Sequence, residues 1–263
     1  MKNNFISRTI TAALIVASVV AILLTNFNII SLAFILTSNL AIYELIRVLE
    51  KMDKSVLKAP AYIFNNIFLL VIAFVGKEYA LVLLCIYFIS LAISLIFDKN
   101  KTINDLSTNV FLAIYITCAY STIILLKDPK WIGFAIFITA FSDTFAYLVG
   151  ISIGKNKFNF LKELSPKKTI EGSVGGIFGS LLFVYLFKLY FNLDHVLLMY
   201  LASILISIVS QFGDLFASYI KRRANVKDYG KILRGHGGIM DRFDSLLFVA
   251  PLVYLFVNLL ELV

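Results

Sequence analysis

Long apolar stretches recur from one end of this chain to the other, and they constrain its fold more than any other feature. Each stretch is about 17–25 residues long, the length that an α-helix needs to cross a lipid bilayer. Nine of them are expected to form transmembrane helices, at residues 9–24, 29–46, 57–75, 79–97, 106–126, 131–150, 173–190, 196–218 and 243–262. The sequence therefore predicts an all-α fold, a polytopic membrane helix bundle of about nine transmembrane helices.

The composition excludes a soluble globular domain. Of the 263 residues, 60% are apolar and 15% are charged, and the mean hydropathy is +0.90. So few polar groups cannot cover the apolar surface in water, whereas membrane lipids can solvate it. We expect no nucleic-acid partner despite the net charge of +8, because no compact soluble basic domain is present. A homodimer is the one protein assembly that we consider.

The basic residues predict the orientation of the helices. When the loops are assigned alternately to the two sides of the membrane, 20 of the 24 Lys and Arg residues lie on the side of the N-terminus. Cytoplasmic loops carry such an excess. The first apolar stretch follows Lys2 and Arg8 as in a secretory signal, but it lacks a clear cleavage site, so we expect it to remain as the first span. Together with the Lys-, Asn-, Ile- and Phe-rich composition, this predicts a bacterial inner membrane and a cytoplasmic N-terminus.

The two halves of the chain differ in their polar residues. Residues 1–130 are expected to be mainly scaffold helices. There, Glu44 and Arg47 lie three residues apart at a helix end, and we expect them to pair or to extend to the membrane interface. Residues 131–263 have longer, glycine-rich polar loops, so we expect the catalytic site on the cytoplasmic side of this half.

Two predicted helices of the second half, at residues 131–150 and 196–218, carry a carboxylate inside the membrane, at Asp143 and Asp214. A charged side chain within a span costs at least ~2.5 kcal/mol by insertion scales, so such a residue usually marks a functional site. A hydrogen bond between helices is the alternative explanation for each residue. Both are expected near the cytoplasmic side, from helices that run in the same direction, which favours a shared site.

The loop before the seventh predicted helix has the sequence Ser-Pro-Lys-Lys-Thr at residues 165–169. Pro166 interrupts a continuous helix, so Lys167 and Lys168 stand just before the next span. Lysines and the backbone amides of a helix start would suit an anionic phosphate ligand. The alternative is a positively charged cytoplasmic loop followed by a Gly-x-x-x-Gly packing face, at residues 172–176 and 175–179.

Carboxylates, basic residues and glycines are mixed most densely in residues 211–244. Ser218, Lys221 and Arg222 follow Asp214 at intervals that place them on one helix face. In metal-assisted phosphoryl transfer, carboxylates hold Mg²⁺, the metal bridges nucleotide phosphates, and Lys and Arg neutralise the developing charge. The segment therefore predicts this chemistry, although Asp241 and Asp244 taken alone could simply cap the last helix.

The same segment resembles the phosphatidate cytidylyltransferases, also called CDP-diacylglycerol synthases, whose pattern is S-x-x-K-R-x4-K-D-x-G-x2-L-x-G-H-G-G-x-x-D-R-x-D. It is matched by Ser218, Lys221, Arg222, Lys227, Asp228, Gly230, Leu233, Gly235, His236, Gly237, Gly238, Asp241, Arg242 and Asp244. Upstream parts of the family pattern are matched at residues 143–147, 165–169 and 211–214. The chain departs from the pattern at Arg234, where the family usually has proline.

The resemblance implies an Mg²⁺-dependent nucleotidyl transfer of phospholipid biosynthesis, in which CTP and phosphatidate give CDP-diacylglycerol and pyrophosphate. It implies Asp214 and Asp241 as the metal ligands, with a second cation considered. The implied catalytic residues are Asp143, Lys167, Lys168, Asp214, Lys221, Arg222, Asp241 and Arg242. The implied substrate-binding residues are Ser165, Thr169, Ser218, Lys227, Asp228, His236, Gly237, Gly238 and Asp244.

Two alternative functions stay open at this point. A CTP-dependent polyprenol kinase shares parts of the C-terminal pattern, but it transfers the γ-phosphoryl group of CTP. A transporter could use Asp143 and Asp214 as a relay for protons or cations. The transporter alternative does not explain why carboxylates, basic residues and glycines are concentrated in residues 211–244.

Overall fold

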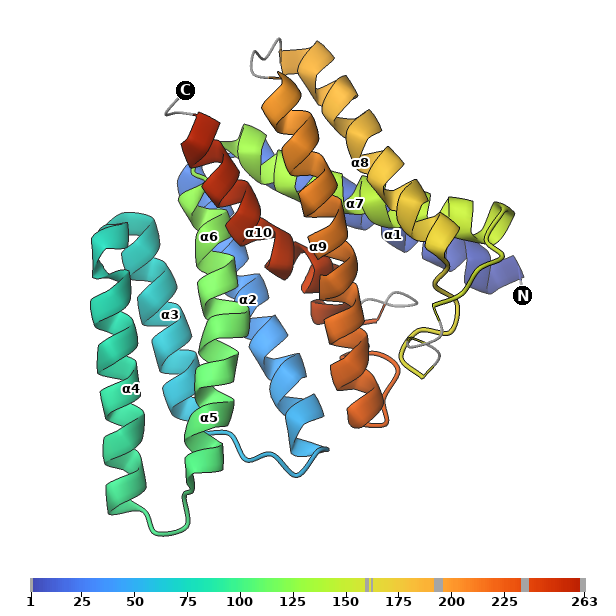
Figure 1. Ribbon diagram of the computed structural model, residues 1–263. Helices are drawn as coiled ribbons and strands as arrows, with labels where there is room; N and C mark the ends of the chain where they lie inside the picture. Colours follow the sequence, from blue (N-terminus) through green and yellow to red (C-terminus); the bar gives the residue numbers. More distant parts are fainter. Residues whose placement is uncertain (1, 159–160, 162, 192–195, 233–236, 261–263) are drawn as a thin grey trace. The chain divides into compact units, whose positions relative to one another are not determined.

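The structure is a computed structural model that describes residues 2–158, 161, 163–191, 196–232 and 237–260. Over these ranges the regular elements are helices joined by loops, and Lys157 and Thr169 form an isolated antiparallel bridge. The elements, drawn in Figure 1, are α1 (Lys2–Leu23), α2 (Phe27–Glu50), α3 (Lys58–Phe74), the 3₁₀ helix η1 (Lys77–Tyr79), α4 (Ala80–Phe97), α5 (Ile103–Leu112), the π-helix η2 (Ala113–Cys118), α6 (Ala119–Leu125), α7 (Pro129–Ser152), α8 (Ile170–Phe191), α9 (Val196–Arg223) and α10 (Met240–Leu260).

Each of the nine predicted spans coincides with one helix or with a continuous run of helices. The fifth span is the run α5–η2–α6, and the fourth is η1 with α4. Seven spans of the described chain are long and apolar enough to cross a membrane, whereas α3 and the apolar part of α1, Ala13–Leu23, are shorter. These helices confirm an all-α, multi-pass membrane protein.

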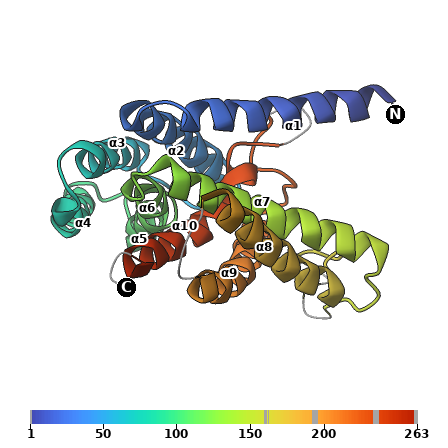
Figure 2. The same cartoon turned by 90° about the horizontal axis from the view of Figure 1, so that it is seen from above.

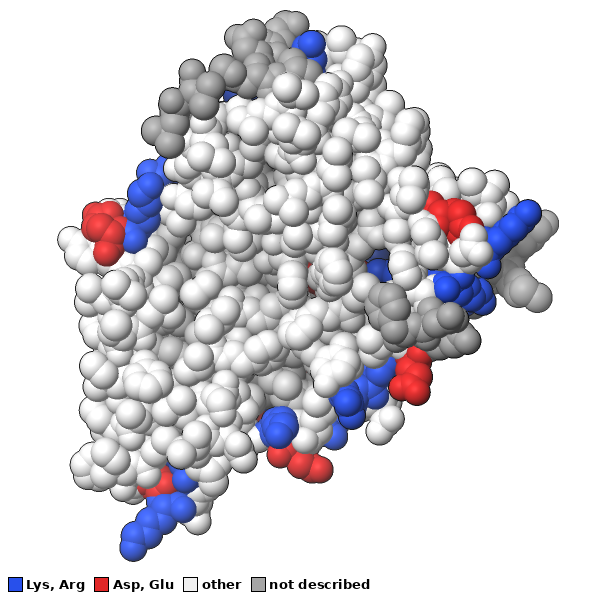
Figure 3. All heavy atoms as spheres, viewed as in Figure 1, with Lys and Arg blue, Asp and Glu red and all other residues white. Residues whose placement is uncertain are grey.

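The outer surface of the helices is apolar, as lipid contact requires. In the apolar part of the span formed by η1 and α4, only 11% of the residues are buried, and Leu81, Ile86 and Phe88 are exposed. On the face drawn in Figure 3 charged side chains are few and lie in small groups. Helices suit such surroundings because all their backbone hydrogen bonds are internal.

The chain forms two compact units. The first unit comprises residues 1–129 and 223–243, and the second comprises residues 130–222 and 244–263. The segment that follows α9 therefore belongs to the same unit as the N-terminal helices. The sequence-based division at residue 130 into scaffold and catalytic halves remains a prediction about function.

A buried polar seam joins α2, α3 and η2 in the first unit. The Asn65 side chain donates to Ser38 Oγ at 2.9 Å, and Thr117 Oγ1 donates to Asn65 Oδ1 at 2.9 Å. All three side chains are buried. Hydrogen bonds of this kind between membrane helices contribute roughly 1 kcal/mol each and fix the register of the helices.

The segment after α9 joins this unit through aromatic packing. The ring of Phe243 lies 5.6 Å from that of Tyr120 and 6.4 Å from that of Phe34, measured between centroids. Offset and edge-to-face contacts at such distances are favourable. They anchor the start of α10 on α2 and α6.

In the second unit, α7 and α8 lie side by side and approach closely along a glycine face (Figure 2). A Cβ atom at Gly175 would lie 2.5 Å from Val149 Cβ, and one at Gly179 would lie 2.6 Å from Phe145 Cβ. The predicted Gly-x-x-x-Gly packing face is therefore confirmed. It positions the loop that precedes α8, which carries Lys168.

Candidate active site

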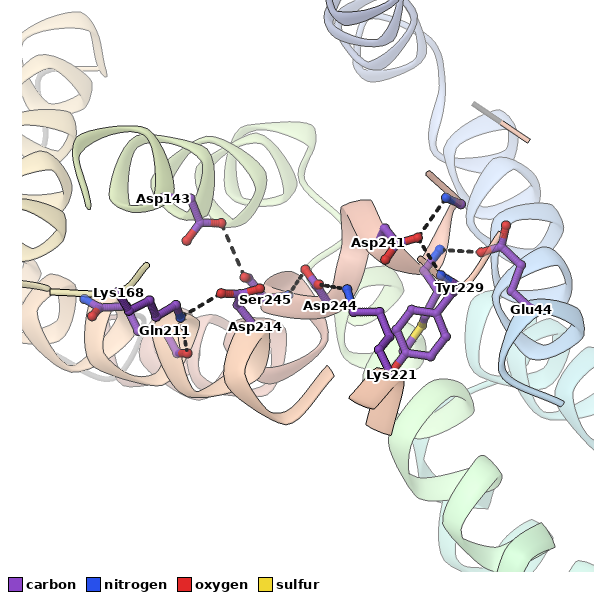
Figure 4. Close-up of polar contacts among 12 residues, drawn as sticks. Glu44, Asp143, Lys168, Gln211, Asp214, Lys221, Tyr229, Asp241, Asp244 and Ser245 are labelled. Carbon is purple, nitrogen blue, oxygen red and sulfur yellow. Dashed lines mark hydrogen bonds and ion pairs between the residues drawn. The ribbon is translucent and has the colours of Figure 1, made fainter. Parts of the chain in front are cut away.

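Two of the predicted motif segments meet in the second unit through an ion pair. Lys168 Nζ lies 2.7 Å from Asp214 Oδ2 and donates a hydrogen bond to the backbone oxygen of Gln211 at 3.2 Å. Lys168 comes from the loop before α8, and Asp214 comes from α9 (Figure 4). The two side chains are 23% and 36% exposed, so charged groups of a ligand can reach both.

Local hydrogen bonds fix the loop that carries Lys168. Thr169 accepts a bond from the backbone N–H of Gly172 at 3.0 Å, which is an N-cap for α8. The carboxylate of Glu171 accepts bonds from the backbone N–H and the side chain of Asn156. Lys168 therefore stands at a defined position at the start of α8.

A second, more buried ion pair connects α9 with α10. Lys221 Nζ lies 3.9 Å from Asp244 Oδ2, and each side chain is 11% exposed. This distance exceeds that of a hydrogen bond. Charges so poorly exposed to water cost several kcal/mol of desolvation each, and in a membrane protein they usually mark a functional site.

Ser245 links Asp244 to Asp143. Its backbone N–H donates to Asp244 Oδ1 at 2.8 Å, and its hydroxyl donates to Asp143 Oδ2 at 3.3 Å. The hydrogen bond between helices that was the alternative explanation for Asp143 is therefore present. The second unit also brings carboxylates of α7, α9 and α10 into contact with Lys168, Lys221 or Ser245 (Figure 4).

In the first unit, Asp241 holds the backbone of the glycine-rich segment. Its Oδ2 accepts bonds from the N–H groups of Tyr229 at 2.8 Å and of Gly238 at 2.9 Å (Figure 4). Gly237 has a φ of +83°, in the region that favours glycine. Asp241 therefore binds a backbone N–H just before α10, at Gly238, which is close to the helix-capping role considered for it.

The other predicted site residues are mostly accessible. The exposed ones are Lys167, Arg222, Lys227, Asp228 and Arg242, and the half-buried ones are Ser165 and Ser218. His236 and Arg234 lie outside the described residues. The two predicted metal ligands belong to different units, Asp214 to the second and Asp241 to the first.

Glu44 is the residue whose surroundings the sequence analysis missed. It was expected to pair with Arg47 or to extend to the interface, but its side chain is fully buried. Its two oxygens accept hydrogen bonds from the backbone N–H groups of Ile239 and Met240. The Arg47 guanidinium instead lies 5.6 Å from the centroid of the Tyr43 ring. The one available signal was a carboxylate within an apolar span.

The carboxylates suit a hard divalent cation. Mg²⁺ prefers oxygen ligands and is commonly held by one or two carboxylates, with substrate phosphates and water as its other ligands. In the described part of the chain, no three His, Cys, Asp or Glu side chains are grouped as a metal cage. One or two ligands from Asp143, Asp214, Asp241 and Asp244 are compatible with the donor chemistry of Mg²⁺.

The similarity to known proteins extends over both units of the chain. A model of the cytidylyltransferase family matches residues 6–260. The phosphatidate cytidylyltransferase of Staphylococcus haemolyticus is 47% identical over 125 residues, which are 47% of each chain. That of Bacillus subtilis is 39% identical over 163 residues, 59% of this chain and 60% of the relative. That of Thermotoga maritima is 36% identical over 157 residues, 57% of this chain and 54% of the relative. In these alignments the chain spans about half the length of the curated relatives it matches.

Since the family model covers nearly the whole chain, this protein belongs to the cytidylyltransferase family.

Proposed function

We propose that the protein is a phosphatidate cytidylyltransferase, which makes CDP-diacylglycerol and pyrophosphate from phosphatidate and CTP. The observation that carries the proposal is the 2.7 Å ion pair between Lys168 and Asp214. It joins two polar motifs that are far apart in the sequence, within a protein whose surface is suited to lipid. Named relatives with this activity support the choice of substrates.

The proposed reaction needs no nucleophile from the protein. A phosphate oxygen of phosphatidate attacks the α-phosphorus of CTP, and the bond from that phosphorus to the oxygen leading to the β-phosphorus breaks. Pyrophosphate leaves with the bonding electrons. The protein would act by orienting two anionic substrates and by stabilising charge in the transition state.

Lys168 and Lys221 are the best placed cations for this work. In the structure each stands against a carboxylate, Asp214 or Asp244. An incoming phosphate would compete for the ammonium groups, and the carboxylates keep those groups in place before substrate binds. We infer that Lys167, Arg222 and Arg242, which are exposed, make further phosphate contacts.

Mg²⁺ is part of the proposal, with Asp214 and Asp241 as carboxylate ligands. When bound, the ion would supply positive charge beside the phosphates of CTP and stabilise the leaving pyrophosphate. Asp143 and Asp244 would orient the lysines or contribute to a second cation site. Removal of divalent cations with EDTA should abolish lipid product, and added Mg²⁺ should restore it.

Two positions of the radiolabel in CTP test the reaction. Purified protein with phosphatidate, Mg²⁺ and CTP labelled at the α-phosphorus should give labelled lipid, whereas CTP labelled at the γ-phosphorus should give labelled pyrophosphate only. A polyprenol kinase, given polyprenol, would show the reverse and label its lipid from the γ-position. A transporter would produce no labelled lipid, and that result would refute the proposed enzyme.

We also propose that the protein lies in a bacterial inner membrane with its N-terminus in the cytoplasm, where CTP is available. In a background with Cys85 and Cys118 replaced by alanine, Lys127→Cys should react with an impermeant maleimide in intact spheroplasts. Lys231→Cys should react only after the membrane is permeabilised. Both positions are exposed, so accessibility within the protein does not limit labelling. Labelling of Lys231→Cys from outside would contradict the orientation, and with it the supply of CTP to this segment.

A further inference from the structure

Glu44 forms hydrogen bonds across a long sequence separation in the first unit. Its Oε1 accepts from the N–H of Ile239 at 3.1 Å, and its Oε2 accepts from the N–H of Met240 at 2.8 Å (Figure 4). The donors are 195 and 196 residues away in the chain. Both oxygens of a fully buried carboxylate thus accept hydrogen bonds from the backbone at the start of α10.

The physical chemistry of a helix start explains this contact. The first N–H groups of a helix have no partner within the helix, and they carry partial positive charge. A buried carboxylate is costly unless such donors satisfy it. Glu44 therefore replaces a local cap with one supplied by α2, and the backbone at Ile239 and Met240 becomes tied to that helix.

Two glycines of the same segment are explained by Glu44 as well. A Cβ atom built at Gly230 or at Gly238 would collide with the Glu44 carboxylate. The backbone therefore approaches Glu44 twice, once at each end of residues 230–238. The carboxylate ends a flexible side chain, but it is buried and held by two hydrogen bonds, so a larger residue at either position would have to displace it.

Asp241 holds the same backbone through other atoms. It accepts the N–H groups of Tyr229 and Gly238, whereas Glu44 accepts those of Ile239 and Met240. Two carboxylates from different helices thus bind four backbone N–H groups in residues 229–240. Without either carboxylate, buried or part-buried backbone donors would lose their partners, and this loss is costly.

We propose that Glu44 is a positioning residue that holds the backbone at Gly230 and at residues 238–240 in the conformation required to bind CTP. The inference rests on the proposed function, because it assigns this glycine-rich segment to the nucleotide. Glu44 itself would touch neither substrate. It would act through the backbone at Gly230, Gly238 and the first turn of α10.

Glu44→Gln tests the geometry and the function separately. The new amide keeps one acceptor but turns its N–H₂ group toward a backbone N–H, so one of the two bonds is lost. Hydrogen exchange measured by mass spectrometry should become about 10-fold faster in peptides that cover residues 229–243. The KM for CTP should rise about 10-fold, since one lost buried bond has about this effect on an equilibrium. The KM for phosphatidate should stay within a few-fold.

Glu50→Gln is the matched control. It is the same substitution on the same helix, but Glu50 is partly exposed and pairs with Lys58 on the surface. We expect wild-type exchange and wild-type KM values for this variant. A Glu44→Gln enzyme with an unchanged KM for CTP would overturn the proposal, even if its exchange were faster. Failure of the proposed function would look different, because the wild-type protein would then form no labelled lipid from α-labelled CTP.

A double-mutant cycle decides the question if Glu44→Gln does not fold. Gly230→Ala should raise the KM for CTP, because its methyl group meets the Glu44 carboxylate. Glu44→Asp withdraws the carboxylate by one methylene group and should make room for that methyl. The two changes together should therefore cost clearly less than the sum of their separate effects. Additive effects, as expected for Gly230→Ala with Glu50→Asp, would refute the contact that the proposal requires.

Discussion

Asp214→Asn is expected to lower the rate of the proposed cytidylyl transfer at least ~10³-fold, which is about 4 kcal/mol of transition-state stabilisation. The substitution keeps the shape of the side chain but removes its charge. It would weaken a carboxylate ligand for Mg²⁺ and would also remove the anion that lies 2.7 Å from Lys168. The measurement is the initial rate of lipid labelling by the purified variant at saturating Mg²⁺.

A surface aspartate provides the control for Asp214. Asp98 is 40% exposed and forms an ion pair with Lys101 at 3.5 Å, so Asp98→Asn removes the same charge outside the candidate site. That variant should retain the wild-type rate. Both variants should insert into the membrane and purify like the wild-type protein. Near-normal activity of Asp214→Asn would remove Asp214 from the proposed metal site.

Asp241 permits a sharper version of the same experiment. Both backbone N–H groups bound by Asp241 donate to one oxygen, Oδ2, and the amide oxygen of asparagine can accept them in the same way. Asp241→Asn should therefore keep the two backbone hydrogen bonds but lose the proposed metal ligand, so the reaction rate should fall at least ~10³-fold. Asp241→Ala should lose the hydrogen bonds as well as the proposed metal ligand. If only the alanine variant were inactive, Asp241 would be a loop-holding residue and not a metal ligand.

A further large effect is expected at Lys168. Lys168→Ala should lower kcat/KM by about 10²-fold or more, roughly 3 kcal/mol, because it removes the proposed phosphate contact and the cation beside Asp214. Lys168→Arg should also be impaired, since a planar guanidinium does not replace a compact ammonium at a fixed position. Lys167→Ala should show a loss similar to that of Lys168→Ala. Steady-state kinetics with varied CTP and phosphatidate measure these effects.

Lys157→Ala is the control for the loop lysines. Lys157 lies in the same loop and is exposed, and its bridge to Thr169 uses the backbone, so truncation leaves the bridge intact. Its kcat/KM should stay within a few-fold of wild type. If all three alanine variants behaved alike, residues 165–169 would be a charged cytoplasmic loop, and the phosphate contacts proposed there would be wrong.

The helices were accessible to sequence reasoning because lipid imposes a local rule. A segment that crosses the bilayer must satisfy its own backbone hydrogen bonds, so length and hydropathy suffice to locate it. The bounds of α7 and α8 differ from those expected by only a few residues. The π-helix η2 within the fifth span was not predicted, because its residues continue the same apolar run; within it, Thr117 donates to Asn65 of α3.

The polar segments of the candidate site were also predictable, but their partners were not. Lys168 and Asp214 were both selected from sequence, for their positions near a helix start and inside a span. The ion pair between them depends on the packing of α8, whose glycines bring it against α7. The same holds for Lys221 and Asp244, which lie on different helices.

Sequence alone was sufficient to identify an all-α membrane protein, its family and the segments that carry charge. The hydrogen bonds of Glu44 to Ile239 and Met240, and its close approach to Gly230 and Gly238, are seen only once the helices are packed. Transmembrane helices follow from local apolar runs, whereas backbone N–H groups are the same in nearly every residue. A carboxylate that binds such groups nearly 200 residues away leaves no local pattern, so the contact appears only when the helices are packed.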